Sequence, residues 1–137
     1  MARLLAIDYG KKRTGMAVTD PLQLIATALE TVPSHEMLKF LKAYVAREPV
    51  ELFVVGLPKQ LDGKDSENAA RVRTFVGHLQ NALPDIPVIF HDERFTSQMA
   101  LQAMIAGGST KKDRREKGNI DKVSAAIILQ SYMESKK

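Results

Sequence analysis

Three short apolar runs in this chain each stop at residues that are unusual for the end of a buried strand. The runs and their stops are Leu4–Ile7 before Asp8, Phe53–Val55 before Gly56-Leu57-Pro58, and Val88–Phe90 before His91-Asp92-Glu93. Runs of this length and composition are typical of buried strands. If the three strands are parallel, their stops meet at one edge of a sheet. Carboxylates gathered at the carboxyl edge of a parallel sheet favour a divalent-metal site.

The composition is that of one globular domain spanning residues 1–137. Of the 137 residues, 45% are hydrophobic and 26% are charged, which suits a chain that buries about two-thirds of its unfolded surface. No run approaches the ~18 apolar residues of a membrane span, and the N-terminus lacks the apolar core of a signal peptide, so we expect a cytoplasmic protein without a membrane partner. The absence of Cys excludes disulfides and thiolate zinc sites. The net charge of +4 is compatible with a polyanionic partner.

Turn residues and apolar periodicity predict an alternation of strands and helices. We expect strands at residues 3–8, 14–19, 24–31, 51–56 and 88–91. We expect a helix capped by Ser34, a second with Val72, Phe75, Val76, Leu79 and Leu83 on one face, a third from Thr96 or Ser97 to Gly107-Gly108, and a last from Ile120 or Asp121 to about Glu134. Residues 109–118 are polar and unpatterned, which is typical of a loop.

The spacing of these elements predicts an α/β fold with a five-stranded mixed sheet flanked by helices. Short turns make the first three strands an antiparallel meander, and each crossover helix returns the chain in the direction of the first strand. The first, fourth and fifth strands are then parallel, with the first in the centre. This arrangement brings Asp8, Gly56-Leu57-Pro58 and Asp92-Glu93 to the same edge.

A further carboxylate is expected to join this edge from the last helix. Asp121 precedes Ser124 and Ala125 by three and four residues, and two small residues on one helix face allow close packing against the sheet. Helix packing would then carry Asp121 toward Asp8. Asp121 is equally compatible with a role as an N-cap or a partner of the helix dipole.

The other acidic residues also have structural alternatives. Asp8 would serve in a hairpin turn, and Glu93 would pair with Arg94 on the surface. Asp92 is an alternative metal ligand to Glu93, because adjacent residues of an extended segment face opposite ways. The three His residues show no metal-ligand spacing and are interpreted as structural or surface groups.

Basic residues follow the elements that point at the proposed acidic edge. They are Lys11, Lys12, Arg13, Lys59, Lys64, Arg94, Lys111, Lys112, Arg114, Arg115 and Lys117. When residues 111–117 are considered alone, a solvated loop of mixed charge is the better explanation. Beside a carboxylate cluster, however, cationic flanks favour nucleic-acid binding, because Lys and Arg bind phosphates while carboxylates hold the metal.

Four segments together resemble the YqgF/RuvX family. They are Asp8–Asp20, Val55–Pro58 with Asp62-Gly63, Asp92–Ser97, and Asn119–Asp121 with Ala125–Gln130. The resemblance implies a ribonuclease H-like fold related to the RuvC Holliday junction resolvases, with Asp8, Glu93 and Asp121 as catalytic carboxylates and metal ligands. It also implies a nuclease that matures the 5′ end of pre-16S rRNA in ribosome biogenesis, or a resolvase that acts on DNA junctions. Where RuvC carries two further carboxylates, this chain has Gly56-Leu57-Pro58 and Ser124.

From these residues we expect two-metal hydrolysis of phosphodiester bonds in structured RNA or branched DNA. Hard oxygen ligands favour Mg²⁺ or Mn²⁺ over zinc. We expect the phosphate backbone to contact Lys11, Lys12, Arg13, Lys59, Arg94, Lys111, Lys112, Arg114 and Arg115. The alternatives are a nucleic-acid-binding module with a degenerate site, an ATPase of the actin and Hsp70 type, and a small phosphatase-like hydrolase. The sequence does not decide whether the substrate is RNA or DNA, or whether the protein is a monomer or a homodimer.

Overall fold

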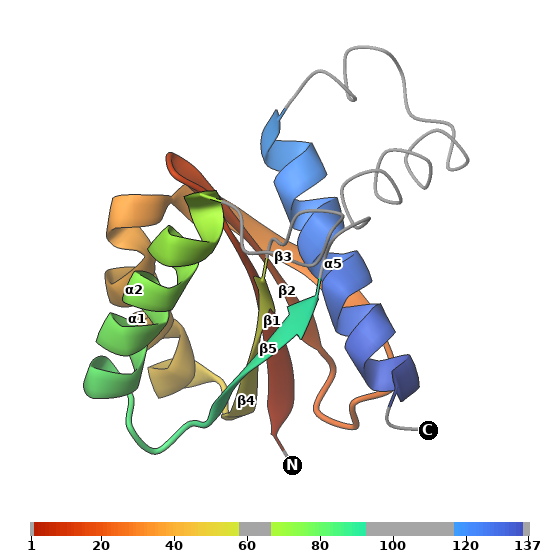
Figure 1. Ribbon diagram of the computed structural model, residues 1–137. Coiled ribbons are helices and arrows are strands. Elements are labelled where there is room, and N and C mark those ends of the chain that lie inside the picture. Colours follow the sequence, from red (N-terminus) through yellow and green to blue (C-terminus); the bar gives the residue numbers. More distant parts are fainter. Residues whose placement is uncertain (1, 58–66, 93–116, 136–137) are drawn as a thin grey trace.

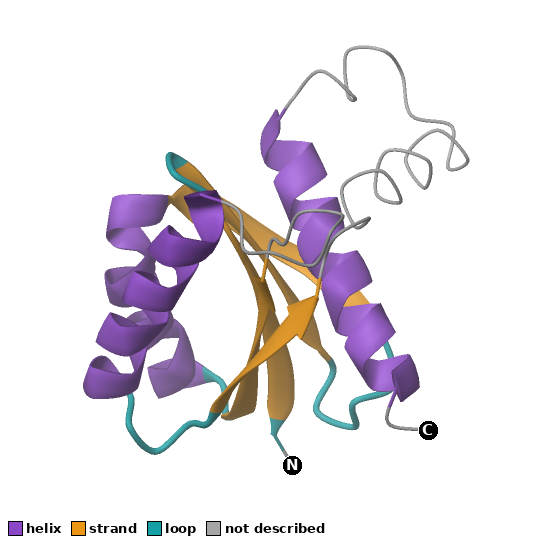
Figure 2. Ribbon diagram, viewed as in Figure 1, coloured by secondary structure: helices purple, strands orange, loops and turns teal. Residues whose placement is uncertain are grey.

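The computed structural model describes residues 2–57, 67–92 and 117–135. In these residues one sheet lies between helices on its two sides (Figures 1 and 2). The elements are β1 (Arg3–Tyr9), β2 (Arg13–Thr19), β3 (Ala26–Pro33), the 3₁₀ turn η1 (Ser34–Glu36), α1 (Met37–Arg47), β4 (Val50–Leu57), α2 (Glu67–Ala82), β5 (Val88–Asp92) and α5 (Lys117–Ser135). None of the described helices is long and apolar enough to span a membrane.

The sheet has the strand order β3-β2-β1-β4-β5. β1 pairs antiparallel with β2, and β2 with β3, because turns too short for a crossover join them. α1 and α2 provide the crossovers that make β4 parallel to β1 and β5 parallel to β4. The predicted mixed five-stranded sheet with a central first strand is therefore confirmed.

The two faces of the sheet are buried against different helices, and side chains alternate between them. Leu5 and Ile7 of β1 belong to the larger core under α1 and α2, together with Phe53 of β4. Leu4 and Ala6 belong to a smaller core under α5. These two sides are called the α1/α2 face and the α5 face below, and Figure 2 shows the helices that cover them.

The predicted start of the first helix is wrong in one respect. Ser34 lies in η1, one turn before α1, and makes no helix-capping hydrogen bond. Its hydroxyl instead donates to the Gly10 carbonyl at 2.5 Å and is hydrogen-bonded to Thr14 Oγ1 at 2.8 Å, while its amide donates to the Lys12 carbonyl at 2.9 Å. Ser34 therefore anchors the β1–β2 turn, because a tertiary contact competes successfully with the local cap.

The third strand begins two residues later than predicted. The carboxylate of Asp20 accepts hydrogen bonds from the amides of Leu24 and Ile25 at 2.8 and 2.9 Å, which holds the preceding residues in a turn. These bonds, led by that from Ile25, lower the pKa of Asp20 below its usual value. Gln23 completes the turn with a positive φ of 58°.

The last helix begins earlier than predicted. α5 starts at Lys117, so Lys117 and Gly118 are helical rather than part of a loop, and Asp121 lies beyond the first turn. The interpretation of Asp121 as an N-cap is thereby wrong. The predicted third helix and residues 109–116 lie outside the described residues.

Candidate active site

Asp8 lies near the carboxyl end of β1 on the α5 face. Leu4 and Ala6 are buried under α5, and Asp8 is next in the same alternation. Its side chain is half-buried. Asp8 pairs with Gly15 of β2, and the register that pairs Ile7 with Val55 brings Gly56 of β4 beside it. Both neighbours of this carboxylate along the sheet therefore lack a side chain.

The direction of α5 determines which of its residues lie near Asp8. Tyr132 and Met133, at the end of α5, line a cavity with Leu4 and Leu52, which lie at the starts of β1 and β4. α5 therefore runs opposite to β1, and Figure 1 shows its start at the end of the molecule that holds the β1–β2 turn. The helix between Met133 and Asp121 spans roughly 18 Å at about 1.5 Å per residue. The strand from Leu4 to Asp8 spans roughly 13 Å, so position 121 reaches the level of Asp8.

The small residues of α5 are buried as predicted. Ser124 and Ala125 are 1% and 0% exposed, and α5 packs across β1 to β4. Position 121 is one turn before them in the same i, i+3, i+4 pattern. The hydroxyl oxygen of Ser124 has no hydrogen-bond partner within the described part of the chain. A buried polar atom of this kind calls for a partner, and it lies one turn from position 121.

The three parallel strands end at one edge, as predicted. Gly56 pairs with His91, and Leu57 with Asp92, so β5 ends level with β4. His91 is hydrogen-bonded to Ser131 of α5 at 2.9 Å, which agrees with a structural role for this histidine. Glu93 lies outside the described residues, as do Lys59, Arg94, Lys111, Lys112, Arg114 and Arg115. Within residues 2–57, 67–92 and 117–135, no three His, Asp or Glu side chains gather into a metal-binding group.

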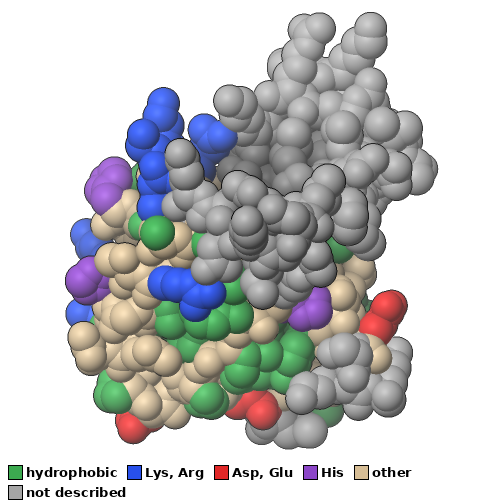
Figure 3. All heavy atoms as spheres, in the orientation of Figure 1, with side chains coloured by type: hydrophobic (Ala, Val, Ile, Leu, Met, Phe, Trp, Pro, Cys, Tyr) green, Lys and Arg blue, Asp and Glu red, His purple; other side chains and the backbone are tan. Residues whose placement is uncertain are grey.

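Basic side chains lie at the same edge. Lys11 and Lys12 are exposed in the β1–β2 turn, and Arg13 is half-buried at the start of β2. Figure 3 shows a group of Lys and Arg side chains at the upper left of the visible face and others at its left and centre, whereas Asp and Glu side chains lie toward its lower part. The Asp8 end of the sheet is therefore suited to a polyanion.

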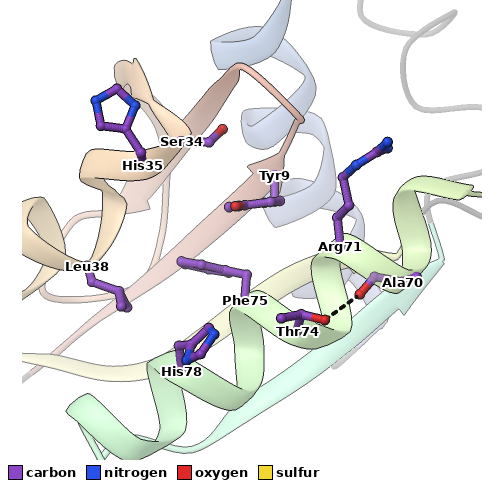
Figure 4. A pocket seen from close by; sticks show the side chains of 9 residues that line it. All are labelled: Tyr9, Ser34, His35, Leu38, Ala70, Arg71, Thr74, Phe75 and His78. Atoms are coloured by element: carbon purple, nitrogen blue, oxygen red, sulfur yellow. Dashed lines mark hydrogen bonds between the residues drawn. The ribbon is translucent and has the colours of Figure 1, made fainter.

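Tyr9 reaches the α1/α2 face at this edge, a feature that the sequence analysis did not single out. Its ring stacks on Phe75 of α2, with centroids 4.5 Å apart and planes 19° from parallel. The two rings line a groove between η1–α1 and α2 (Figure 4). In the sequence, strand alternation already indicates that Tyr9 lies on the face opposite Asp8. The groove itself depends on how α1 and α2 pack.

Comparison with known proteins identifies the family of this chain. The RuvX family profile, described as "Holliday junction resolvase", matches residues 2–135. A protein of Phocaeicola vulgatus named "Putative pre-16S rRNA nuclease" is 59% identical over 137 residues, which are 100% of this chain and 99% of that protein. A protein of the same name from Parabacteroides distasonis is 57% identical, over 100% of this chain and 98% of the relative.

Solved structures support the fold. T. thermophilus RuvC in complex with a Holliday junction substrate has a TM-score of 0.57 at 20% identity, over 97% of this chain and 96% of that chain. A second Thermus thermophilus RuvC structure has a TM-score of 0.51 over 96% of each chain, again at 20% identity. At this identity the likeness concerns the fold, and the predicted ribonuclease H-like class is confirmed.

Proposed function

This chain belongs to the RuvX family, and from that membership we propose that it is a metal-dependent nuclease that hydrolyses phosphodiester bonds of precursor 16S rRNA. The relatives named for this activity match over the whole chain at 57–59% identity. One structural observation carries the proposal: Asp8 lies next to the last residue of the central strand, on the face where α5 approaches, between two glycines of the adjoining strands. The side chain of Asp8 is partly exposed there, which allows a bound cation to reach it.

We assign the catalytic carboxylates to Asp8, Glu93 and Asp121. The direction of α5 supports Asp121. The alternation of β5 supports Glu93 over Asp92, because Ile89 packs in the core under α5 and His91 bonds to α5. Position 92 is in phase with Val88, which packs in the core of the opposite face. Continued alternation would give position 93 to the α5 face, which is the face of Asp8.

The donor set fits Mg²⁺ or Mn²⁺. The three assigned groups are carboxylates, which these ions prefer, and the chain has no Cys to favour zinc. The buried Ser124 hydroxyl, without a partner among the described residues, is a further oxygen close to position 121. When bound, the metal would lower the pKa of the attacking water and stabilise the leaving oxygen, as in two-metal nucleases.

The remaining work of the site falls to the protein's own groups. The negative charge of the site comes from the carboxylates of Asp8, Glu93 and Asp121. This charge orients the phosphate of the cleaved bond. Gly15 and Gly56, both buried beside Asp8, add no side chain of their own next to this carboxylate. We propose that cations of the edge then bind the flanking phosphates and position the strand without discriminating sequence; they are Lys11, Lys12, Arg13, Lys59, Arg94, Lys111, Lys112, Arg114 and Arg115.

The decisive experiment compares Asp8→Asn with wild type on a precursor 16S rRNA fragment and on a four-way DNA junction. Wild type should cut the RNA in Mg²⁺ or Mn²⁺, with little cleavage in Ca²⁺ because its looser coordination does not impose in-line geometry. EDTA should stop cleavage without unfolding the protein. Asp8→Asn should lose cleavage by about a thousandfold or more, a change of roughly 4 kcal/mol in the barrier, while binding RNA as tightly as wild type.

Asp20→Asn is the matched control, since Asp20 caps its own turn at the other end of β2 and should leave cleavage unchanged. Wild-type cleavage by Asp8→Asn would contradict the site. If only the DNA junction is cleaved, the protein is a junction resolvase and not an rRNA nuclease. Metal-independent binding without cleavage of either substrate would make the chain a binding module.

A further inference from the structure

A groove opens on the α1/α2 face at the same edge of the sheet as Asp8. Its volume is about 510 Å³, and its lining includes Tyr9, His35, Arg71, Phe75 and His78. In Figure 4 the ring of Tyr9, from β1, lies between the labelled side chains of η1–α1 and those of α2, next to Phe75 of α2. A space of this size is within the range of roughly 300–1,000 Å³ that is typical of ligand sites.

The lining combines an aromatic surface with a polar, cationic rim. Tyr9 is half-buried and stacks on buried Phe75, so the pair forms a rigid apolar platform. Arg71, His35 and His78 are exposed around it. None of the described residues that line the groove is acidic. A planar heteroaromatic group with an attached anion matches this chemistry, because it stacks on aromatic rings while Arg binds the anion.

The position of the groove connects it to the proposed cleavage site. Tyr9 follows Asp8 directly in β1, with about 3.8 Å between their Cα atoms, and the two side chains leave the strand on opposite faces. A nucleic-acid strand that crosses the carboxyl edge over Asp8 therefore meets the groove next. Lys11 and Lys12, in the turn just beyond, extend the cationic surface along the same edge.

We propose that this groove holds one unstacked base of a single-stranded segment of the substrate, next to the bond cleaved at Asp8. The inference rests on the proposed nuclease function for the identity of its ligand. The base stacks on the Tyr9 side of the aromatic pair, and Arg71 contacts the adjoining phosphate. A substrate with an unpaired nucleotide beside the cleaved bond is then preferred over a continuous duplex, whose bases stay stacked.

The test is binding of short single-stranded oligoribonucleotides, each with a fluorescent adenine analogue at one position, in Ca²⁺. Stacking quenches such an analogue, so wild type should quench it at one position more than at the others. Tyr9→Leu, which keeps the apolar contact with Phe75, should weaken binding about tenfold and remove the quenching, as expected for one lost base stack. Tyr9→Phe keeps the ring and should restore both.

The Arg71 contact has its own readout and control. Arg71→Ala should lower the salt dependence of binding by about 0.7 in slope, the value for one phosphate contact of a single strand. Arg47→Ala replaces another exposed arginine, at the far end of α1, and should leave the slope unchanged. Thermal unfolding of each variant should give a midpoint close to that of wild type, which checks that the fold is intact.

The outcomes separate this inference from the proposed function. Quenching that survives in Tyr9→Leu, or that is lost equally in Tyr9→Phe, overturns the base site, even if wild type cleaves precursor rRNA. Position-specific quenching that depends on the ring at position 9, in a protein that cleaves neither RNA nor DNA, supports the base site and overturns only the nuclease function. Equal salt slopes for wild type and Arg71→Ala would show that Arg71 makes no phosphate contact.

Discussion

The two faces of the sheet are packed with side chains of different sizes. The α1/α2 face is filled by large side chains, among them Leu5, Ile7, Met16 and Phe53, each 0% exposed. The α5 face combines large side chains, such as Ile128 and Leu129, with small ones at Ala6, Ala17 and Ala125, all 0% exposed. Large buried side chains contribute most to stability, whereas small ones let a helix approach the sheet closely. One face thus mainly stabilises the fold, and on the other we propose that α5 brings position 121 close to Asp8.

The central strand serves both purposes through simple alternation. Ile7 is buried in the larger core, Asp8 lies on the α5 face, and Tyr9 returns to the α1/α2 face. Because successive side chains of a strand point to opposite faces, three consecutive residues contribute to the core, to the proposed chemistry and to the groove. Substitutions on the two faces should therefore have separable effects.

The largest effect on stability is expected from Phe53→Ala on the α1/α2 face. Removing a fully buried aromatic ring should lower the free energy of unfolding by about 3–5 kcal/mol, measured by urea denaturation. Phe90→Ala is the matched control, because Phe90 is 40% exposed and its loss should matter far less. Equal losses for the two variants would contradict the assignment of the main core to this face.

A smaller loss of stability is expected from Ala125→Leu on the α5 face. The added volume at a 0% exposed contact should cost about 1–3 kcal/mol through overpacking. The new side chain also forces α5 away from the sheet. The rate of cleavage at saturating substrate should therefore fall by more than the lower stability alone explains. Ala46→Leu, at an exposed position of α1, should change neither. Unaltered cleavage in a stably folded Ala125→Leu protein would show that close packing of α5 is not needed.

Two buried serines sharpen the comparison further. Ser34→Ala removes a hydroxyl bonded to Gly10 and Thr14 and should destabilise by about 1–3 kcal/mol, since it leaves a buried partner unsatisfied. Ser124→Ala removes a hydroxyl without a partner among the described residues, so urea denaturation without metal should show no loss of stability. If that hydroxyl serves the metal site, Ser124→Ala should raise the Mg²⁺ concentration required for cleavage. Loss of metal-free stability similar to that of Ser34→Ala would reveal a partner for Ser124.

The smallest effect is expected from the exposed cations of the edge. Lys11→Ala with Lys12→Ala should leave stability unchanged and flatten the salt dependence of RNA binding by roughly 0.7–0.9 in slope per lost phosphate contact. The matched control is Lys39→Ala with Lys42→Ala, two exposed lysines of α1. If both pairs change the slope equally, the attraction is due to net charge rather than to this edge.

Much of the fold was predictable because its signals are local. The run before Asp8 indicated a buried strand, and short turns indicated the antiparallel meander. The helical spacing of Val72, Phe75, Val76 and Leu79 indicated a buried helix face, and all four are buried. The motifs around Asp8 also led to the RuvX family, which the family profile confirms. The assignment of Glu93 and Asp121 as site residues stays a prediction.

Local signals were wrong where a distant contact decided the outcome. Ser34 has the sequence signature of a helix cap, yet its hydroxyl serves the β1–β2 turn, because Gly10 and Thr14 offer it buried partners. The first turn of α5 was missed because Lys117, Gly118 and Asn119 offer no apolar residue from which a helical period can be recognised.

From the sequence alone we could predict the strand order, the carboxylate near the end of the central strand and the family. These depend on composition, short turns and alternation, which act between neighbours in the chain. The packing of the helices decided three further features: α5 runs opposite to β1, the Ser124 hydroxyl is buried, and Tyr9 and Phe75 line a groove beside Arg71. These features depend on which helix packs on which face and at what angle, and such packing is a property of side-chain volumes across the whole core.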